Sequence, residues 1–356
     1  MIDKPTNIVD CDIHPAVRSM ADLEPWLEKR WVEHFREYGA LRNQHYTAGA
    51  GYHKSQPNAS RRDAYPPEGG PQGSSLGFMR SQHLDQNGIG TGILNPLISS
   101  QGVRNLEHSA ALCRAINHWQ AELWVDNEPR LRASIVVPYE DPEASAEEIR
   151  RWAGDRRFAQ ILMLSRTSFP TGNKRYWPIF AAAAEAGIPV GIHAFGNSGW
   201  PVTSAGWPSF YMDEMVGHAP TSQSGLVSLV VEGVFERWPT LKLVLVESGF
   251  TWAPALIARL DRDWKILKSE VPHLKLSPGE YIRRNVWWTS QPLDEPDNKR
   301  FLGDLFDWLG WDRLLFSSDY PHWDFDDPSR VIMFPATDEQ RAQFFGGNAR
   351  AVYGFD

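Results

Sequence analysis

Asp12 and His14, close to the N-terminus, are the first residues in the chain whose types and spacing could do chemistry. They follow a short apolar segment, residues 7–9, that is expected to form a β-strand. Because side chains alternate between the two faces of a strand, Asp12 and His14 point the same way. A carboxylate and an imidazole in this arrangement could bind one divalent metal ion. The pair is also compatible with an ordinary turn before Pro15, so the metal-site prediction depends on further ligands.

The elements that must position these residues follow a regular alternation. From residue 78 onward, short apolar segments alternate with longer helical patterns. Further strands are expected at 90–94, 131–137, 159–164, 188–193, 241–246, 285–289 and 314–317. Helices are expected at 104–127, 142–153, 176–186, 224–237, 252–267, 298–309 and 338–352. About eight strands alternating with helices predict an α/β fold, a (β/α)8 TIM barrel formed by a single domain over residues 1–356.

Catalytic groups of such a barrel lie where the strands end. The expected strand 188–193 ends in His193, and the strand 241–246 is followed by Glu247. The last strand is followed by Asp319, with His322 just beyond it. Because the carboxyl ends of parallel strands meet at one mouth of the barrel, these residues should join Asp12 and His14. The metal-site prediction is therefore strengthened.

A long irregular insertion follows the first strand, over residues 39–76, and is rich in Gly, Pro, Ser and Asn. A loop of this length inside a compact domain is usually functional or disordered. Its aromatic and arginine content favours an ordered cover over a pocket. It is also a plausible place for contact with a second copy of the chain.

The composition restricts the classes of partner. The chain has 36 basic and 44 acidic residues, a formal charge of -8, which argues against a nucleic-acid partner. It has two cysteines, too few for a disulfide framework. No apolar run is long enough to span a membrane, and the N-terminus has no apolar signal core. We therefore expect a cytoplasmic enzyme with a small-molecule substrate.

Several of these motifs together resemble the amidohydrolase superfamily, in the branch called amidohydrolase family 2. The motifs are Asp12-Ile13-His14, His193, Glu247-Ser248-Gly249, Ser318-Asp319-Tyr320-Pro321-His322 and Gly347-Asn348-Ala349-Arg350-Ala351-Val352-Tyr353. The branch is typified by aminocarboxymuconate-semialdehyde decarboxylase and contains metal-dependent hydrolases and decarboxylases. The resemblance covers nearly the whole chain and implies the same barrel, often as a homodimer or higher homo-oligomer.

The resemblance also implies a ligand set, with two departures from the usual pattern. The first-strand motif is usually His-x-His, whereas this chain has Asp12 at the first position. The lysine that bridges two metals in binuclear members is missing after the strand 159–164. One divalent metal ion is therefore expected, with zinc preferred over manganese or iron. Its ligands would be Asp12, His14, His193 and Asp319.

The roles of three residues stay open at this point. Glu247 could be a general base, a further ligand, a partner that orients a histidine, or merely the cap of a following helix. Asp319 could act both as a ligand and as the proton acceptor from metal-bound water. His322 could donate a proton to the product or hydrogen-bond the substrate, or it could be an ordinary surface histidine.

Residues that could bind the substrate are less clearly marked. Arg61, Arg62 and Arg166 could pair with a carboxylate. Trp200 would suit a planar substrate, and His218 lies in the same segment.

The overall prediction is a metal-dependent hydrolase that uses metal-activated water. Its substrate would be a small aromatic or unsaturated carboxylic acid, amide, ester or lactone. The alternative is a non-oxidative decarboxylase of an aromatic or enolic acid, and a more remote one is a non-catalytic metal-binding scaffold.

Overall fold

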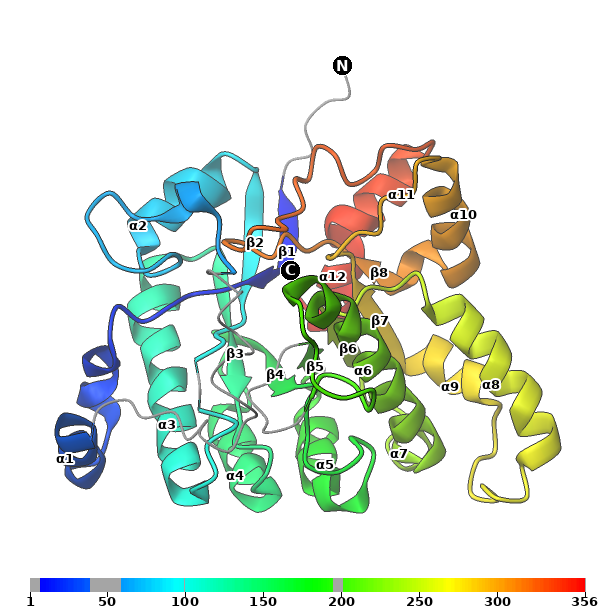
Figure 1. Ribbon diagram of the computed structural model, residues 1–356, viewed down its shortest axis with the longest axis horizontal. Coiled ribbons are helices and arrows are strands. Elements are labelled where there is room, and N and C mark those ends of the chain that lie inside the picture. The colour runs from blue at the N-terminus through cyan, green and yellow to red at the C-terminus, as the bar shows by residue number, and fades with distance from the viewer. Residues whose placement is uncertain (1–6, 39–58, 99, 195–200, 356) are drawn as a thin grey trace.

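The protein is described by a computed structural model that covers residues 7–38, 59–98, 100–194 and 201–355. Eight strands form one sheet in the order β1 to β8, and each pairs in parallel with the next (Figure 1). The strands are β1 Ile8–Ile13, β2 Ile89–Leu94, β3 Leu131–Val136, β4 Phe158–Leu164, β5 Val190–His193, β6 Leu243–Val246, β7 Val286–Thr289 and β8 Leu314–Leu315. This arrangement confirms the predicted (β/α)8 TIM barrel.

The barrel closes where the first and last strands meet. The backbone N–H of Cys11 donates to the carbonyl of Phe316 at 3.0 Å, and that of Asp319 donates to the carbonyl of Asp12 at 3.1 Å. Closure therefore places Asp12 and Asp319 beside each other, although they are far apart in the sequence.

The helices lie outside the strands (Figure 1). They are α1 Lys29–Tyr38, α2 Leu76–Met79, α3 Leu106–Trp119, α4 Pro142–Trp152, α5 Trp177–Ala186, α6 Tyr211–Val231, α7 Val234–Arg237, α8 Ala253–Leu267, α9 Pro278–Asn285, α10 Arg300–Leu309, α11 Asp338–Ala342 and α12 Asn348–Tyr353. All residues of β4 and β6 are buried. Strands covered on both faces in this way consist of nearly continuous apolar residues, which explains why they were recognisable in the sequence.

Several elements differ from the sequence prediction, and two of them bear on the site. β1 extends to Ile13, so Asp12 lies within the strand rather than in a turn after it. α6 begins at Tyr211, well before the expected residue 224. Its first half contains Pro220 and polar residues without a clear apolar stripe, so the helical pattern was not visible there.

The long insertion is described only in part. Residues 39–58 lie outside the described residues, whereas residues 59–75 form an irregular segment with a short 3-10 helix, Arg62–Ala64. Ser60 forms an antiparallel bridge with His322, so the end of the insertion lies at the mouth of the barrel.

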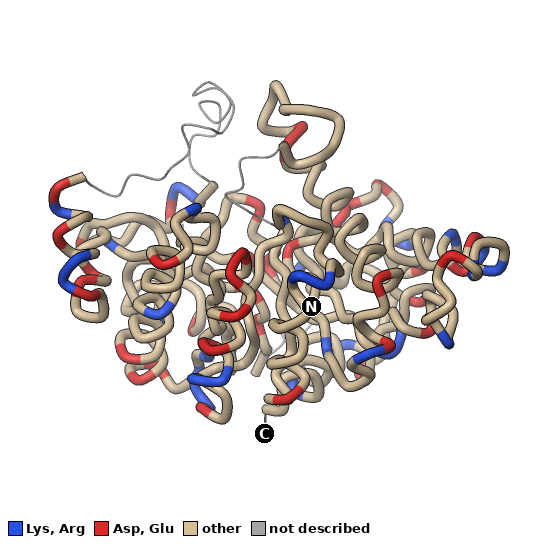
Figure 2. Tube along the Cα trace, turned by 90° about the horizontal axis from the view of Figure 1, so that it is seen from below, with Lys and Arg blue, Asp and Glu red and all other residues tan. Residues whose placement is uncertain are grey.

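The surface charge is mixed. Lys and Arg are interspersed with Asp and Glu over the described part of the trace (Figure 2). Within the described ranges, no helix is both long and apolar enough to cross a lipid bilayer.

Candidate metal centre and active site

The carboxyl ends of four strands bring metal-binding side chains together at the mouth of the barrel. The side chains form two overlapping groups, and within each group the ligand atoms lie within 4.8 Å of one another. One group consists of Asp12, His14, His193 and Glu247; the other consists of His14, Glu247, Asp319 and His322. The structure thus brings all six of the predicted metal-binding and catalytic residues into one place.

Two of the carboxylates belong to residues with a left-handed backbone conformation. Glu247, after β6, has φ of 51°, and Asp319, after β8, has φ of 61°. Residues other than glycine seldom adopt this left-handed conformation, and each costs about 1–3 kcal/mol when the surroundings impose it. The backbone N–H of Glu247 donates to Thr289 Oγ1 at 3.0 Å, which helps hold the turn. Strain at both strand ends indicates that the position of these carboxylates matters for function.

The imidazole of His14 has a defined protonation pattern. Its Nδ1 lies 2.7 Å from the carbonyl oxygen of Asn95, which can only accept, so Nδ1–H is the donor. In the neutral ring Nε2 then carries a bare lone pair. This atom lies 2.7 Å from Asp319 Oδ1 and 3.3 Å from Asp12 Oδ1. A backbone carbonyl that orients a histidine in this way is typical of metal sites.

His193 faces the same space from β5. Its Nε2 lies 2.8 Å from Glu247 Oε2 and 3.6 Å from Asp12 Oδ2. Burial alone would lower the pKa of His193, but the charges of Glu247 and Asp12 raise it to about 9. Burial alone would raise the pKa of Asp12, but His14 and His193 hold it well below its usual range. The carboxylates of the centre therefore favour positive charge at this point, which a metal cation could supply.

The donor set fits one divalent metal ion. Asp12 Oδ2, His14 Nε2 and Glu247 Oε2 are buried and form no hydrogen bond within the described residues. Buried polar atoms without hydrogen bonds are costly, and several that converge on one point are best satisfied by a cation. Imidazole nitrogen and carboxylate oxygen are donors that divalent transition metals accept.

The side chains of Asp319 and His322 lie within hydrogen-bond distance of each other at the edge of the centre. His322 Nδ1 lies 2.6 Å from Asp319 Oδ1, and its ring stacks on His14 at 4.4 Å between ring centres. Burial and the charge of Glu247 raise the pKa of Asp319 well above its usual range. Burial and the charge of His14 lower the pKa of His322 to about 4. His322 is therefore not an ordinary surface histidine.

Sequence reasoning missed two amides that support the ligands. Asn95, directly after β2, donates from Nδ2 to Asp12 Oδ1 at 2.8 Å. Gln291, just beyond β7, donates from Nε2 to Asp319 Oδ2 at 3.1 Å. Both follow strand ends, so the rule that found the ligands could have found them too. The search considered only groups that bind metal or exchange protons, which excluded amides.

Asp10 lies at the centre of a buried hydrogen-bond network. Its carboxylate accepts the backbone N–H of Asp12 at 3.2 Å and that of Ser318 at 2.9 Å. It also lies 2.8 Å from His83 Nε2. The network ties the end of β1 to the residues just before Asp319.

The three arginines predicted to bind substrate have different surroundings. Arg61 forms a two-pronged ion pair with Asp63, and Arg62 is exposed in the short 3-10 helix. Arg166, at the end of β4, is buried and pairs with Glu214 of α6 at 2.8 Å. A substrate carboxylate would have to compete with Glu214 for Arg166 and with Asp63 for Arg61.

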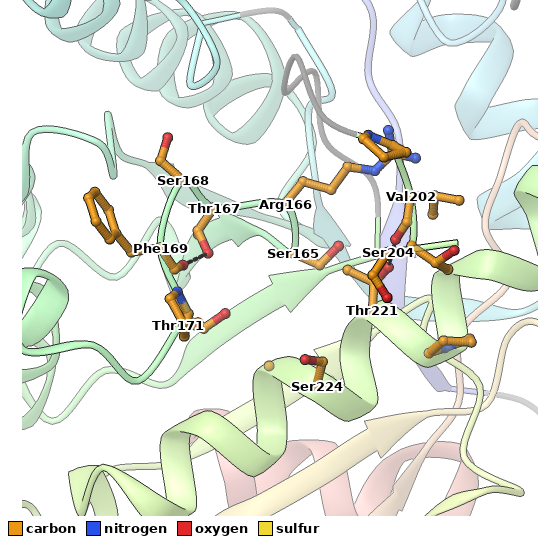
Figure 3. Close-up of a pocket in the computed structure, with 15 residues that line it drawn as sticks. Ser165, Arg166, Thr167, Ser168, Phe169, Thr171, Val202, Ser204, Thr221 and Ser224 are labelled. Carbon is orange, nitrogen blue, oxygen red and sulfur yellow. Dashed lines mark hydrogen bonds between the residues drawn. The ribbon is translucent and has the colours of Figure 1, made fainter. Parts of the chain in front are cut away.

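Arg166 borders a cavity of about 560 Å³ between the end of β4 and α6. Figure 3 shows Ser165 and Arg166 at the strand end, with Thr221 and Ser224 on the helix that faces them. The described residues that line this cavity do not include the candidate metal ligands.

Of the remaining candidates, Trp200 lies outside the described residues. His218 is buried on α6, and its Nδ1 has no hydrogen-bond partner within the described residues. Burial lowers its pKa. Its role as a substrate-binding residue stays a prediction.

A second cavity, of about 410 Å³, opens directly beside the metal centre. His14 and His322 form part of its wall, together with residues from the segment after β1, the segment after β2 and α3. A ligand in this cavity would reach the metal-binding side chains.

The family model for amidohydrolases matches residues 9–355 of the chain. The chain therefore belongs to the amidohydrolase family, as its motifs predicted, and is an enzyme of the hydrolase or carboxy-lyase type.

Similar proteins of known name are decarboxylases. A gamma-resorcylate decarboxylase from Polaromonas sp. is 24% identical over 296 residues, which is 77% of this chain and 86% of that protein. A 2-amino-3-carboxymuconate-6-semialdehyde decarboxylase from Dictyostelium discoideum is 22% identical over 59% of this chain and 56% of that protein.

Solved structures share the fold. A 5-carboxyvanillate decarboxylase from Novosphingobium aromaticivorans, complexed with manganese, has a TM-score of 0.75 at 20% identity and covers 99% of this chain and 97% of that one. A 2,6-dihydroxybenzoate decarboxylase from Rhizobium has a TM-score of 0.68 at 19% identity, with 99% and 100% covered.

Proposed function

We propose that the protein is a metal-dependent decarboxylase that removes carbon dioxide from an aromatic acid. The observation that carries this proposal is the likeness to named decarboxylases over most of the chain. This supports the alternative prediction from the sequence better than the main one, because none of the named relatives above is a hydrolase. The geometry of the barrel mouth agrees, since the candidate metal ligands lie beside His322, whose Nδ1 is 2.6 Å from Asp319 Oδ1.

In this proposal Asp12, His14, His193 and Asp319 hold one divalent ion, and Asn95 and Gln291 fix two of them. When bound, the ion supplies positive charge that binds and orients the substrate carboxylate and an adjacent hydroxyl group. Manganese suits a site with this many carboxylates, and it is present in the 5-carboxyvanillate decarboxylase structure. The zinc expected from the sequence has no comparable support.

The proton that decarboxylation needs is delivered by Asp319, which lies 2.6 Å from His322 Nδ1 and can exchange a proton with it. The bond between the ring carbon and the carboxylate carbon breaks, and its electron pair stays on the ring carbon. The proton joins that pair and forms the new C–H bond. Carbon dioxide leaves. His322, in contact with Asp319, returns a proton from solvent to it. Glu247 keeps His193 oriented and takes part in proton transfer.

The experiment is a direct comparison of the two chemistries. The protein is stripped of metal, reloaded separately with Mn²⁺ and Zn²⁺, and incubated with hydroxybenzoates on one side and aromatic amides and lactones on the other. Carbon dioxide release from an aromatic acid, dependent on the ion, supports the proposal. Hydrolysis without carbon dioxide release would favour the hydrolase, and metal binding without any turnover would favour the scaffold.

A further inference from the structure

The cavity beside His14 and His322 is larger than a single benzoate ring requires. An apolar cavity of about 150 Å³ already accommodates benzene. The cavity here has a volume of about 410 Å³ and shares two side chains with the metal centre. A ring whose carboxylate lies at the centre would leave much of this space to be filled by something else.

Most of the cavity wall away from the metal centre is apolar, and its polar part is formed by Arg18, Ser19, Ser60 and Gln72. The apolar part is formed chiefly by Met20, Phe35, Leu97, Ile98, Val103 and Leu112. The remaining aromatic wall is the ring of His108, which stacks on Trp31 at 4.6 Å between ring centres. Burial lowers the pKa of His108 to about 4, so this ring is uncharged at neutral pH. Apolar surface of this kind gains free energy when it covers an apolar group and removes it from water.

The charge available to a ligand in this cavity is small. Among the described residues lining it, the permanent cation is Arg18, which is exposed. Two carboxylates lie near Arg18: Asp22, which accepts its backbone N–H at 2.8 Å, and Glu68, whose pKa it helps to lower. A second carboxylate on a substrate would lose hydration in the cavity without gaining a buried cation in return.

We infer that the substrate is an aromatic acid that carries an uncharged, largely apolar extension, such as an alkyl, aryl or alkoxy group, and that this extension occupies the cavity. The inference rests on the proposed decarboxylation and specifies its substrate class. It separates this chain from enzymes whose substrates are compact dihydroxybenzoates or carry a second carboxylate.

The test uses the full chain loaded with Mn²⁺ and three kinds of acid. They are 2,6-dihydroxybenzoate, the same acid with a propyl or phenyl group at each free ring position, and the same acid with a second carboxylate. One methylene group in an apolar pocket changes kcat/KM by roughly 10-fold or more. At one ring position at least, propyl or phenyl should raise kcat/KM by about 10-fold or more. The second carboxylate should lower it by a similar factor.

Variants then locate the effect in the cavity. Val103→Trp and, as a milder change, Ile98→Phe fill space at half-buried positions of the wall. Each should reduce the ratio of kcat/KM for the propyl acid to that for the unsubstituted acid by roughly 10-fold. Val271→Trp, a matched change at a half-buried valine in the loop after α8, should leave the ratio unchanged. An unchanged ratio in both wall variants would overturn the inference, as would a wild-type preference for the compact or doubly charged acid.

Failure of this inference is distinguishable from failure of the proposed function. Calorimetry measures the Kd of the corresponding phenols, which are the products, on the Mn²⁺-loaded protein and needs no turnover. If no acid is decarboxylated but propyl and phenyl phenols bind about 10-fold more tightly than resorcinol, the cavity assignment stands and the reaction is wrong. If carbon dioxide is released but the phenols bind equally well, the reaction stands and the cavity assignment is wrong.

Discussion

The hydrogen bond from Asn95 to Asp12 can be tested by replacing the amide with an apolar side chain of similar size. Asn95 Nδ2 donates to Asp12 Oδ1 at 2.8 Å and to the Cys11 carbonyl at 3.2 Å. Its Oδ1 accepts from Ser134 Oγ at 2.8 Å and from Gln160 Nε2 at 2.9 Å. Asn95→Leu removes all four hydrogen bonds. It leaves the backbone carbonyl that orients His14 in place.

Two effects of different size should follow. The hydrogen bond to the Asp12 carboxylate is worth roughly 1.5–3 kcal/mol and each of the three neutral ones about 1 kcal/mol, so the free energy of unfolding of the metal-free protein should fall by about 4.5–6 kcal/mol. Loss of a group that orients a ligand typically weakens metal binding by about 10–100-fold, which is the range we expect for Mn²⁺.

A matched control separates positioning from general damage. Asn117, on α3, is buried and forms three hydrogen bonds, with Val136 and Glu148, away from the metal centre. Asn117→Leu should cost a similar free energy of unfolding, roughly 3.5–5 kcal/mol, yet leave the Kd for Mn²⁺ unchanged.

The assay is urea denaturation of both metal-free variants, followed by Mn²⁺ titration at a temperature where both are folded. The reasoning fails if Asn95→Leu binds Mn²⁺ as tightly as the wild type. It fails equally if both variants lose the same amount of affinity.

Three further changes test individual side chains. Asp319→Asn should abolish carbon dioxide release and weaken metal retention, because the residue is assigned both ligand and proton roles; turnover at full metal occupancy would contradict this. Glu247→Gln should keep metal content near normal and slow turnover by roughly 100-fold, the usual worth of acid–base help. Wild-type turnover would reduce Glu247 to a structural residue, and loss of metal would make it a ligand. His108, with a folded-state pKa of about 4 against 6.5 when unfolded, takes up a proton more readily in the unfolded chain. Stability should therefore fall as the pH falls from about 6.5 to 4, by about 1 kcal/mol between pH 7.5 and 5.5. Urea denaturation at the two pH values should show that His108→Phe loses about 1 kcal/mol less free energy of unfolding than the wild type does. If the variant and the wild type lose the same amount, His108 is not the source of the pH dependence.

The residues of the candidate metal centre could be predicted to lie together because local patterns in the sequence specify them. Apolar runs marked the strands, and strands that alternate with helices close into a barrel whose carboxyl ends meet. Asp12, His193 and Asp319 each stand at such an end, so their convergence followed from counting strands. The family motifs added the expectation of a single metal ion.

The sequence did not show what each side chain contacts across the barrel. From the sequence, Arg166 was predicted to pair with a substrate carboxylate. In the structure it forms an ion pair with Glu214, 48 positions further along the chain. Asn95 was not singled out in the sequence, but it donates a hydrogen bond to Asp12, 83 positions away. Hydrophobic periodicity describes only the element that carries it, so it identifies strands and helices but not their side-chain partners.

The sequence therefore determined the family, the barrel and which side chains line its mouth. The tertiary structure decided how those side chains are oriented and where the adjoining space lies. The cavity beside His14 forms where the segment after β1, the segment after β2 and α3 pack together. Its apolar walls exist only after those segments have met, because no single segment encloses a volume. For that reason the substrate class depends on the structure, whereas the metal centre could be read from the chain.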